Sequence, residues 1–227
     1  MAQETEIKLQ IRDEQALRSA LKRLGAQSVA ASPGRVYEQN VIFDTPQGGL
    51  AKNGQLLRIR TETPHHPSSK RGSGASSRTV LTFKQPPVAA SSFEQADALR
   101  RHKIREEFEL EVSDPAILTR IFEGLGMKGW FRYEKYRTTY RLTHRAHWAR
   151  GLLLELDETP IGTFLELEGP PEAIDRAAQE LGFSKHDYIL KNYLALYFEE
   201  CRRKGREPRN MLFEPPPLVE AQRKKSK

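Results

Sequence analysis

The segment Arg105-Glu-Glu-Phe-Glu-Leu-Glu-Val112 alternates charged and apolar side chains with a period of two residues. In an extended strand, successive side chains point to opposite faces, so the charged residues share one face and the apolar residues the other. The charged set is Arg105, Glu107, Glu109 and Glu111, and the apolar set is Phe108, Leu110 and Val112. This segment predicts a strand with one fully charged face.

The same alternation recurs along most of the chain and predicts eight strands. Their connections are mostly too short for parallel crossovers, which favours an antiparallel sheet. Eight antiparallel strands in one domain favour a closed or nearly closed barrel, so the expected fold class is α+β. The predicted strands cover about residues 2–11, 35–43, 55–62, 78–85, 104–112, 131–142, 151–157 and 162–168.

Between and after the strands, four segments carry helical apolar stripes and capping signals, at about 13–24, 114–124, 170–182 and 187–203. Each stripe needs an apolar partner. If the helices cover the apolar face of the sheet, the charged face must point into the barrel, where it suits a polyanion with its metal ions. Periodicity alone does not establish which face is inside. Tyr193 and Tyr197, four residues apart, are interpreted as helix packing.

The 227-residue chain has 37 Lys and Arg against 30 Asp and Glu, a formal net charge of +7, and a mean hydropathy of −0.67. Most of the surplus lies in a Ser/Gly/Pro-rich segment, 64–78, and in residues 202–227. We therefore expect one folded domain over 1–204 with a flexible insertion at about 63–79, followed by a basic, Pro-containing mobile tail over 205–227. Because the rest of the chain is slightly acidic, the high pI does not by itself indicate nucleic-acid binding.

The single cysteine, Cys201, excludes an internal disulfide framework and a multi-cysteine zinc site. The N-terminus has neither the basic nor the apolar region of a secretory signal, and no apolar run approaches the roughly 18 residues of a membrane span. The sequence predicts a cytoplasmic protein without a membrane partner.

A series of short motifs adds a family resemblance. The segment Glu4-Thr-Glu-Ile-Lys8 resembles the N-terminal signature of the CYTH superfamily, the triphosphate tunnel metalloenzymes, which includes class IV adenylyl cyclases and thiamine and inorganic triphosphatases. Matching motifs follow in the family's order over about residues 2–200. Asn192 departs from the family's frequent Ser, and the segment 63–79 is longer than a typical link. The further motifs lie at 39–45, 57–60, 81–84, 105–111, 135–137, 156–157, 162–169 and 187–193.

The resemblance implies an eight-stranded antiparallel tunnel, with helices outside, that binds triphosphate with Mg²⁺ or Mn²⁺. Arginine offers paired donors to phosphate oxygens, and carboxylates suit these hard cations. Glu4, Glu6 and Lys8 are the expected catalytic residues, with Glu4 or Glu6 orienting the water. The matching basic residues, expected to bind substrate, are Lys8, Arg58, Arg60, Lys84, Lys135, Arg137 and Lys191. The matching acidic residues, expected on the metal side, are Glu4, Glu6, Glu107, Glu109, Asp157, Glu166 and Glu168.

The favoured function is metal-dependent hydrolysis of inorganic tripolyphosphate to pyrophosphate and phosphate, because nothing in the sequence marks a base or thiamine pocket. Within the same family, a class IV adenylyl cyclase converting ATP to cyclic AMP and pyrophosphate is the alternative. A non-catalytic binder of polyphosphate or nucleic acid is the alternative from another class. A protein that only binds anions would not need all seven of the matching acidic residues. A dimer is common in resembling proteins, although the sequence leaves the oligomeric state open.

Overall fold

The computed structural model describes residues 2–29, 34–65, 77–86, 101–143 and 146–214. In this part of the chain the dominant element is one antiparallel sheet of nine strands. The strands are β1 (Ala2–Ile11), β2 (Ala26–Ser28), β3 (Arg35–Asp44), β4 (Leu56–Pro64), β5 (Arg78–Gln85), β6 (Lys103–Glu111), β7 (Lys128–Leu142), β8 (Leu153–Thr159) and β9 (Gly162–Glu168).

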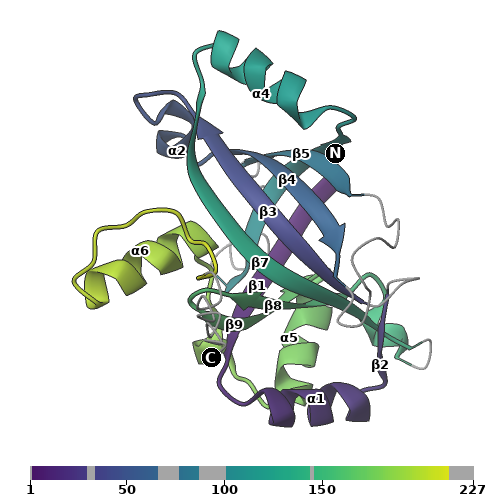
Figure 1. The fold of residues 1–227 in the computed structure, drawn as a ribbon. Coiled ribbons are helices and arrows are strands. Elements are labelled where there is room, and N and C mark those ends of the chain that lie inside the picture. Colours follow the sequence, from purple (N-terminus) through teal and green to yellow (C-terminus); the bar gives the residue numbers. More distant parts are fainter. Residues whose placement is uncertain (1, 30–33, 66–76, 87–100, 144–145, 215–227) are drawn as a thin grey trace, which may run out of the picture.

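The sheet closes on itself. Its order is β2-β7-β3-β4-β5-β6-β1-β9-β8, and an additional pairing of β7 with β8 completes a ring of eight strands. The ring leaves out only β2, which extends the sheet beyond β7 (Figure 1). The predicted eight-stranded antiparallel barrel and its α+β class are confirmed. The three-residue strand β2 is too short to show a period and was not predicted.

Helices surround the barrel. They are α1 (Glu14–Arg23), the single turn α2 (Gly49–Lys52), α4 (Pro115–Gly124), α5 (Pro171–Glu180) and α6 (Tyr193–Arg203), with 3₁₀ turns η1 (His147–Ala149) and η2 (Lys185–Asp187). Asp13 and Asp114 cap α1 and α4 by accepting hydrogen bonds from backbone N–H groups of the first turn. Asn192 caps α6 in the same way.

The helices cover the apolar face of the sheet. α1 and α5 pack beneath β1, β8 and β9, where Ile7, Leu9 and Leu165 are fully buried against Ile174 and its neighbours (Figure 1). On the opposite side, Phe122 of α4 packs on β3 and β4. Since neighbouring residues of a strand face opposite ways, Glu6, Lys8 and Glu166 must point into the barrel.

The last helix begins later than the sequence predicts. A helix was expected from Asp187, but residues 188–192 are not helical and α6 starts at Tyr193. Asp187 instead binds the backbone N–H and the hydroxyl of Ser184, which closes the turn η2. Ile189 then pairs with Lys8 of β1 through two backbone hydrogen bonds. A strand-like contact therefore replaces the first helical turn.

Residues 205–214, assigned to the tail from the sequence, return to the barrel. Met211 is 1% exposed and forms a parallel bridge with Tyr133 of β7. Residues 215–227 and most of the predicted insertion, 66–76, lie outside the described residues. The insertion's flanks, on both sides, belong to β4 and β5. Among the described residues, no helix is both long and apolar enough to span a membrane.

Candidate active site

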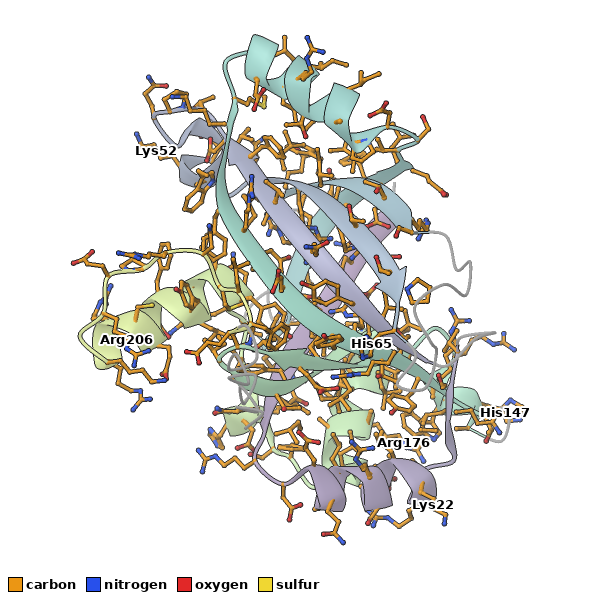
Figure 2. The ribbon with its side chains drawn as sticks, viewed as in Figure 1. Lys22, Lys52, His65, His147, Arg176 and Arg206 are labelled. Atoms are coloured by element: carbon orange, nitrogen blue, oxygen red, sulfur yellow. The ribbon has the colours of Figure 1, made fainter. Side chains whose placement is uncertain are left out.

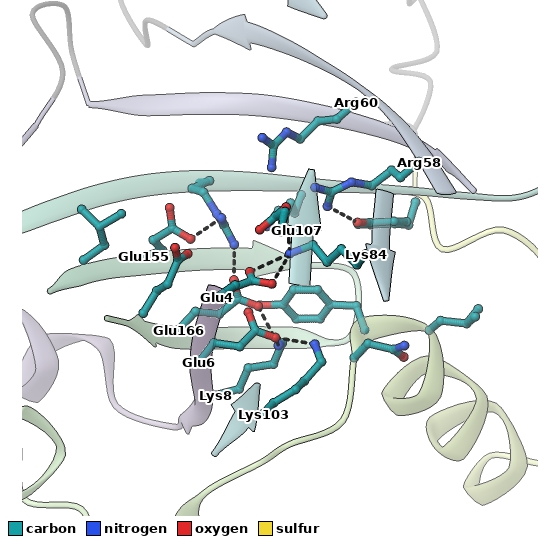
Figure 3. Close-up of a pocket in the computed structure, with 18 of the residues that line it drawn as sticks. Glu4, Glu6, Lys8, Arg58, Arg60, Lys84, Lys103, Glu107, Glu155 and Glu166 are labelled. Carbon is teal, nitrogen blue, oxygen red and sulfur yellow. Dashed lines mark hydrogen bonds and ion pairs between the residues drawn. The ribbon is translucent and has the colours of Figure 1, made fainter. Parts of the chain in front are cut away.

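The barrel encloses a charged cavity of about 260 Å³. Its walls are built from the inward-facing residues of the strands, with Asn192, Tyr193 and Leu194 from the start of α6 (Figure 3). Figure 2 shows the side chains of the described residues along the ribbon of the barrel and its helices. The charged lining residues are Glu4, Glu6, Lys8, Arg58, Arg60, Lys84, Lys103, Glu107, Glu109, Lys135, Arg137, Glu155, Glu166 and Glu168.

On one wall, Glu6 is held by two lysines. Its Oε1 lies 3.1 Å from Lys8 Nζ and also accepts a hydrogen bond from Lys103, while Lys8 lies 2.9 Å from Glu166 Oε1 (Figure 3). Burial alone raises the pKa of Glu6, but Lys8 and Lys103 outweigh it and hold the pKa well below its usual range. Glu6 is therefore a carboxylate at neutral pH, and it accepts hydrogen bonds rather than donating them.

Glu4 pairs with a different cation. Lys84 Nζ lies 2.6 Å from both carboxylate oxygens of Glu4 and 3.1 Å from Glu107 Oε1. Burial raises the pKa of Glu107, and Glu4 raises it further, while Lys84 opposes them. One lysine between the buried Glu4 and the half-buried Glu107 leaves an excess of negative charge on this side of the cavity.

The most enclosed cluster centres on Asp157, which has no exposed surface. Lys135 and Arg137 donate to it, at 2.9 Å from Nζ and 2.7 Å from Nε, and the Tyr193 hydroxyl donates at 2.7 Å. Arg137 also pairs with Glu155 and Glu166. Burial lowers the pKa of Arg137, but these carboxylates raise it well above its ordinary value, so its charge is permanent.

Arg58 differs from the other cations because its hydrogen-bond partners in the described residues are hydroxyls. It donates to Tyr133 Oη at 3.0 Å and to Thr82 Oγ1 at 3.1 Å, and its Nε is buried without a hydrogen-bond partner. The side chain is 7% exposed. A buried guanidinium without a carboxylate partner is costly on its own, so it marks a place for an anionic ligand.

Two carboxyl groups mark the cation-deficient side of the cavity. Burial, and then Glu155 and Glu4, raise the pKa of Glu168 to about 8. Burial raises the pKa of Glu155 to about 7, Arg137 lowers it, and Glu166 and Asp157 raise it. Within the described residues, no three acidic, histidine or cysteine side chains already converge as a metal site. The donors nevertheless fit Mg²⁺ or Mn²⁺, since carboxylate oxygens are the ligands these ions prefer and their charge here is under-compensated.

A model of the CYTH domain family matches residues 2–193. The chain belongs to the CYTH domain family. A curated relative from Methanocaldococcus jannaschii, provisionally named an adenylate cyclase, is 26% identical over 204 residues, which are 85% of this chain and 97% of that protein. CYTH membership thus rests on nearly the whole described barrel and not on one motif.

Solved structures share the fold. A provisionally named adenylate cyclase of Vibrio parahaemolyticus has a TM-score of 0.63 at 16% identity, covering 85% of this chain and 96% of its own. A protein of Pyrococcus horikoshii has a TM-score of 0.63 at 22% identity, covering 87% and 99%. A Hippeastrum protein, provisionally named an adenylyl cyclase and described as revealing a dominant triphosphatase activity, has a TM-score of 0.50 at 21% identity, covering 90% and 97%.

The CYTH barrel gathers most of the residues predicted from the sequence. Twelve of the fourteen predicted residues line the cavity, and a thirteenth, Asp157, lies directly behind Lys135 and Arg137. Lys191 is the one placed elsewhere. Its side chain is 55% exposed, and its Nζ lies 2.5 Å from Glu199 Oε1 on α6. Its role in substrate binding stays a prediction.

Several residues in the wall of the CYTH cavity or directly behind it were not predicted from the sequence. Glu38 lies 3.4 Å from Lys135 and faces inward with Asn40, two residues further along β3. The two-residue spacing of these polar side chains is the signal that could have identified them. Glu155 shares a strand face with Asp157, but only Asp157 was predicted as a site residue. Lys103 stands at the first position of β6, one residue before the predicted strand. Tyr193 was interpreted as helix packing, yet its hydroxyl binds Asp157 in the cavity wall. No periodicity signal marks it.

Proposed function

We propose that this CYTH protein is a divalent-metal-dependent triphosphatase whose preferred substrate is inorganic tripolyphosphate, hydrolysed to pyrophosphate and phosphate. The observation that carries the proposal is Arg58. It is a buried guanidinium with hydroxyl partners, and it faces a cavity that also holds Lys8, Lys135 and Arg137. Tripolyphosphate carries several negative charges and would supply the counter-charge that the protein leaves out.

The carboxylates Glu4, Glu6, Glu166 and Glu168 would hold Mg²⁺ or Mn²⁺, with Glu107 and Glu109 on the adjoining wall. The bound cation would neutralise phosphate charge and favour departure of the pyrophosphate. CYTH triphosphate tunnel enzymes generally depend on such ions. Burial and neighbouring carboxylates raise the pKa of Glu155 and Glu168, and a bound cation would offset this crowded negative charge.

Glu4 or Glu6 orients the attacking water. Because the pKa of Glu6 is held low, this carboxylate is a weak base that aligns the water by accepting its hydrogen bond. The water oxygen forms a bond to the terminal phosphorus, the bond from that phosphorus to the bridging oxygen breaks, and pyrophosphate leaves. The water proton passes to solvent. Lys8, Arg58 and Arg137 stabilise the charge that develops on the phosphate oxygens.

An adenylyl cyclase is the second candidate, and a separate cavity supports it. This cavity of about 140 Å³ shares Ile42, Asn192 and Leu194 with the main cavity and adds Trp130 and Arg105. Apolar and aromatic walls next to a triphosphate site suit an attached organic group. In a cyclase, the ribose 3′ oxygen would form the bond to the α-phosphorus and pyrophosphate would leave. The provisional name of the archaeal relative points the same way.

Product analysis separates these functions. We would incubate the purified protein with tripolyphosphate, thiamine triphosphate or ATP, each with Mg²⁺ or Mn²⁺, and measure phosphate, pyrophosphate and cyclic AMP. Phosphate and pyrophosphate from tripolyphosphate support the triphosphatase. Cyclic AMP from ATP favours the cyclase instead. No product from any of the three would leave a non-catalytic binder of polyphosphate or nucleic acid.

The carboxylate roles have a matched test. Glu6→Gln keeps the side chain's size and should lower kcat by at least about a hundredfold, because the oriented water and the cation lose a carboxylate. Glu172→Gln, in the first turn of α5 outside the cavity, is the control and should leave kcat unchanged. Full metal-dependent activity in the folded double variant Glu4→Gln/Glu6→Gln would sink the proposed site.

A further inference from the structure

We propose that Lys103 is a further substrate-binding residue, whose ammonium group binds a phosphate oxygen of the triphosphate. The inference rests on the proposed function and adds a cation that none of the sequence motifs contains. Lys103 lines the cavity, and its side chain is 17% exposed. In the register of β1 against β6 it stands opposite Glu6, so the two side chains share the inner face (Figure 3).

Among the described residues, Lys103 has fewer carboxylate partners than the neighbouring Lys8. Lys8 pairs with two carboxylates, Glu6 and Glu166, at 3.1 and 2.9 Å. Lys103 has Glu6 as its ion-pair partner in the described residues, and it approaches Oε1, the oxygen that Lys8 already occupies. Two ammonium groups on one oxygen leave the outer one under-compensated in a poorly solvated site. An anion entering the cavity would complete its coordination.

Contacts on the outer face of the barrel hold the backbone next to Lys103 in place. The preceding residue, His102, is 2% exposed and its Nε2 lies 2.9 Å from Asp175 Oδ1 on α5. The Tyr188 hydroxyl donates to the same oxygen at 3.0 Å. Because neighbouring strand residues face opposite ways, this buried network outside the barrel anchors the strand and directs Lys103 inward. The lysine is therefore placed by the fold and does not merely reach the cavity from a loose loop.

Tripolyphosphate binding without metal is the first test. With EDTA present, calorimetry should give a dissociation constant about tenfold or more higher for Lys103→Met than for the unaltered chain, as expected for loss of one charged hydrogen bond. Lys103→Arg, which keeps the charge and donors, should stay within about threefold. Lys128→Met, at an exposed position of β7, is the control. An unaltered dissociation constant in Lys103→Met would overturn the inference.

A double-mutant cycle separates phosphate contact from support of Glu6. If Lys103 binds phosphate, Lys103→Met raises the dissociation constant in the Glu6→Gln background as well. If it acts only through Glu6, the effect disappears in that background, which would overturn the inference. Should Glu6→Gln not fold, Glu6→Asp takes its place. A parent chain that binds no triphosphate refutes the proposed function itself, a result distinct from a parent that binds while Lys103→Met binds equally well.

Discussion

At the residue scale, Asp157 holds the buried charges of the cavity together. It has no exposed surface and accepts from Lys135, Arg137 and Tyr193. Replacing it with alanine leaves two buried cations side by side with fewer counter-charges. We expect Asp157→Ala to lower the free energy of unfolding by about 3 kcal/mol, measured by urea denaturation.

A surface ion pair of similar composition provides the contrast. Lys191 and Glu199 are 55% and 48% exposed, so water already solvates both charges. Glu199→Ala should change the free energy of unfolding by less than about 1 kcal/mol. Equal losses in the two variants would show that burial does not set the strength of the Asp157 cluster.

Glu168 gives the metal-free protein a pH-dependent stability. Burial and the neighbouring Glu155 and Glu4 raise its pKa to about 8 in the folded chain, from an ordinary value near 4.5. Between these two values the folded state binds more protons than the unfolded state, so this group makes stability fall as pH rises from about 4.5 to 8. In Glu168→Gln that contribution is absent.

We therefore expect Glu168→Gln to raise the Tm of the metal-free protein at pH 8 and to change it little at pH 4. The measurement is thermal unfolding in EDTA across that range. Added Mg²⁺ at pH 8 should raise the Tm of the unaltered chain more than that of the variant, because the cation offsets the charge of Glu168. Parallel Tm curves for the two proteins would contradict the placement of this group.

At the element scale, the end of β9 depends on a glycine. Gly169 has φ +148°, and a Cβ there would lie 2.7 Å from the carbonyl oxygen of Gly151 and 3.0 Å from Leu152 Cα. Both atoms belong to the backbone, so they cannot move aside as a side chain can. We expect Gly169→Ala to destabilise the protein by about 1–3 kcal/mol and to displace the end of the strand that carries Glu168.

The matched substitution is Gly124→Ala in α4, where an added Cβ meets nothing within 4 Å. Because alanine favours helix over glycine, this variant should be neutral or up to about 1 kcal/mol more stable. Thermal unfolding of both proteins checks the pair. Two variants of equal stability would show that the approach of Gly169 to the 151–152 backbone does not constrain the barrel.

At the scale of the whole molecule, the barrel was predictable because a period of two persists in seven of the eight ring strands. The strand Arg105–Val112 and six counterparts each separate a charged face from an apolar one, and links that are mostly short favour antiparallel pairing. The inward direction of the charged face could not follow from any strand alone. It follows from the helices, because Ile174 and Phe122 occupy the apolar side.

What the sequence could not supply depends on contacts between distant segments. Tyr193 belongs to a helix by its spacing, but the extended pairing of Ile189 with Lys8 turns its hydroxyl onto Asp157. Glu38 is 2% exposed between cations from β7, a strand about a hundred residues later in the chain. Met211 is part of an interface with β7 that no local pattern marks, since prolines and charges surround it.

Two truncations test how much of the chain the barrel requires. All cavity residues precede Leu196, and Met211 is the last residue buried in the described part of the chain. A chain ending at Glu214 should therefore keep its triphosphate activity and its Tm. A chain ending at Lys204 loses Met211, its bridge to Tyr133 and the contact of Phe213 N–H with Glu134. Its free energy of unfolding, measured by denaturant titration, should be lower by about 2–5 kcal/mol.

If the chain ending at Lys204 were as stable as the one ending at Glu214, the folded domain would end at 204, as the composition predicts. If the chain ending at Glu214 lost activity, the basic segment 215–227 would take part in function. The next hypothesis to test would then be that this segment binds polyphosphate or nucleic acid.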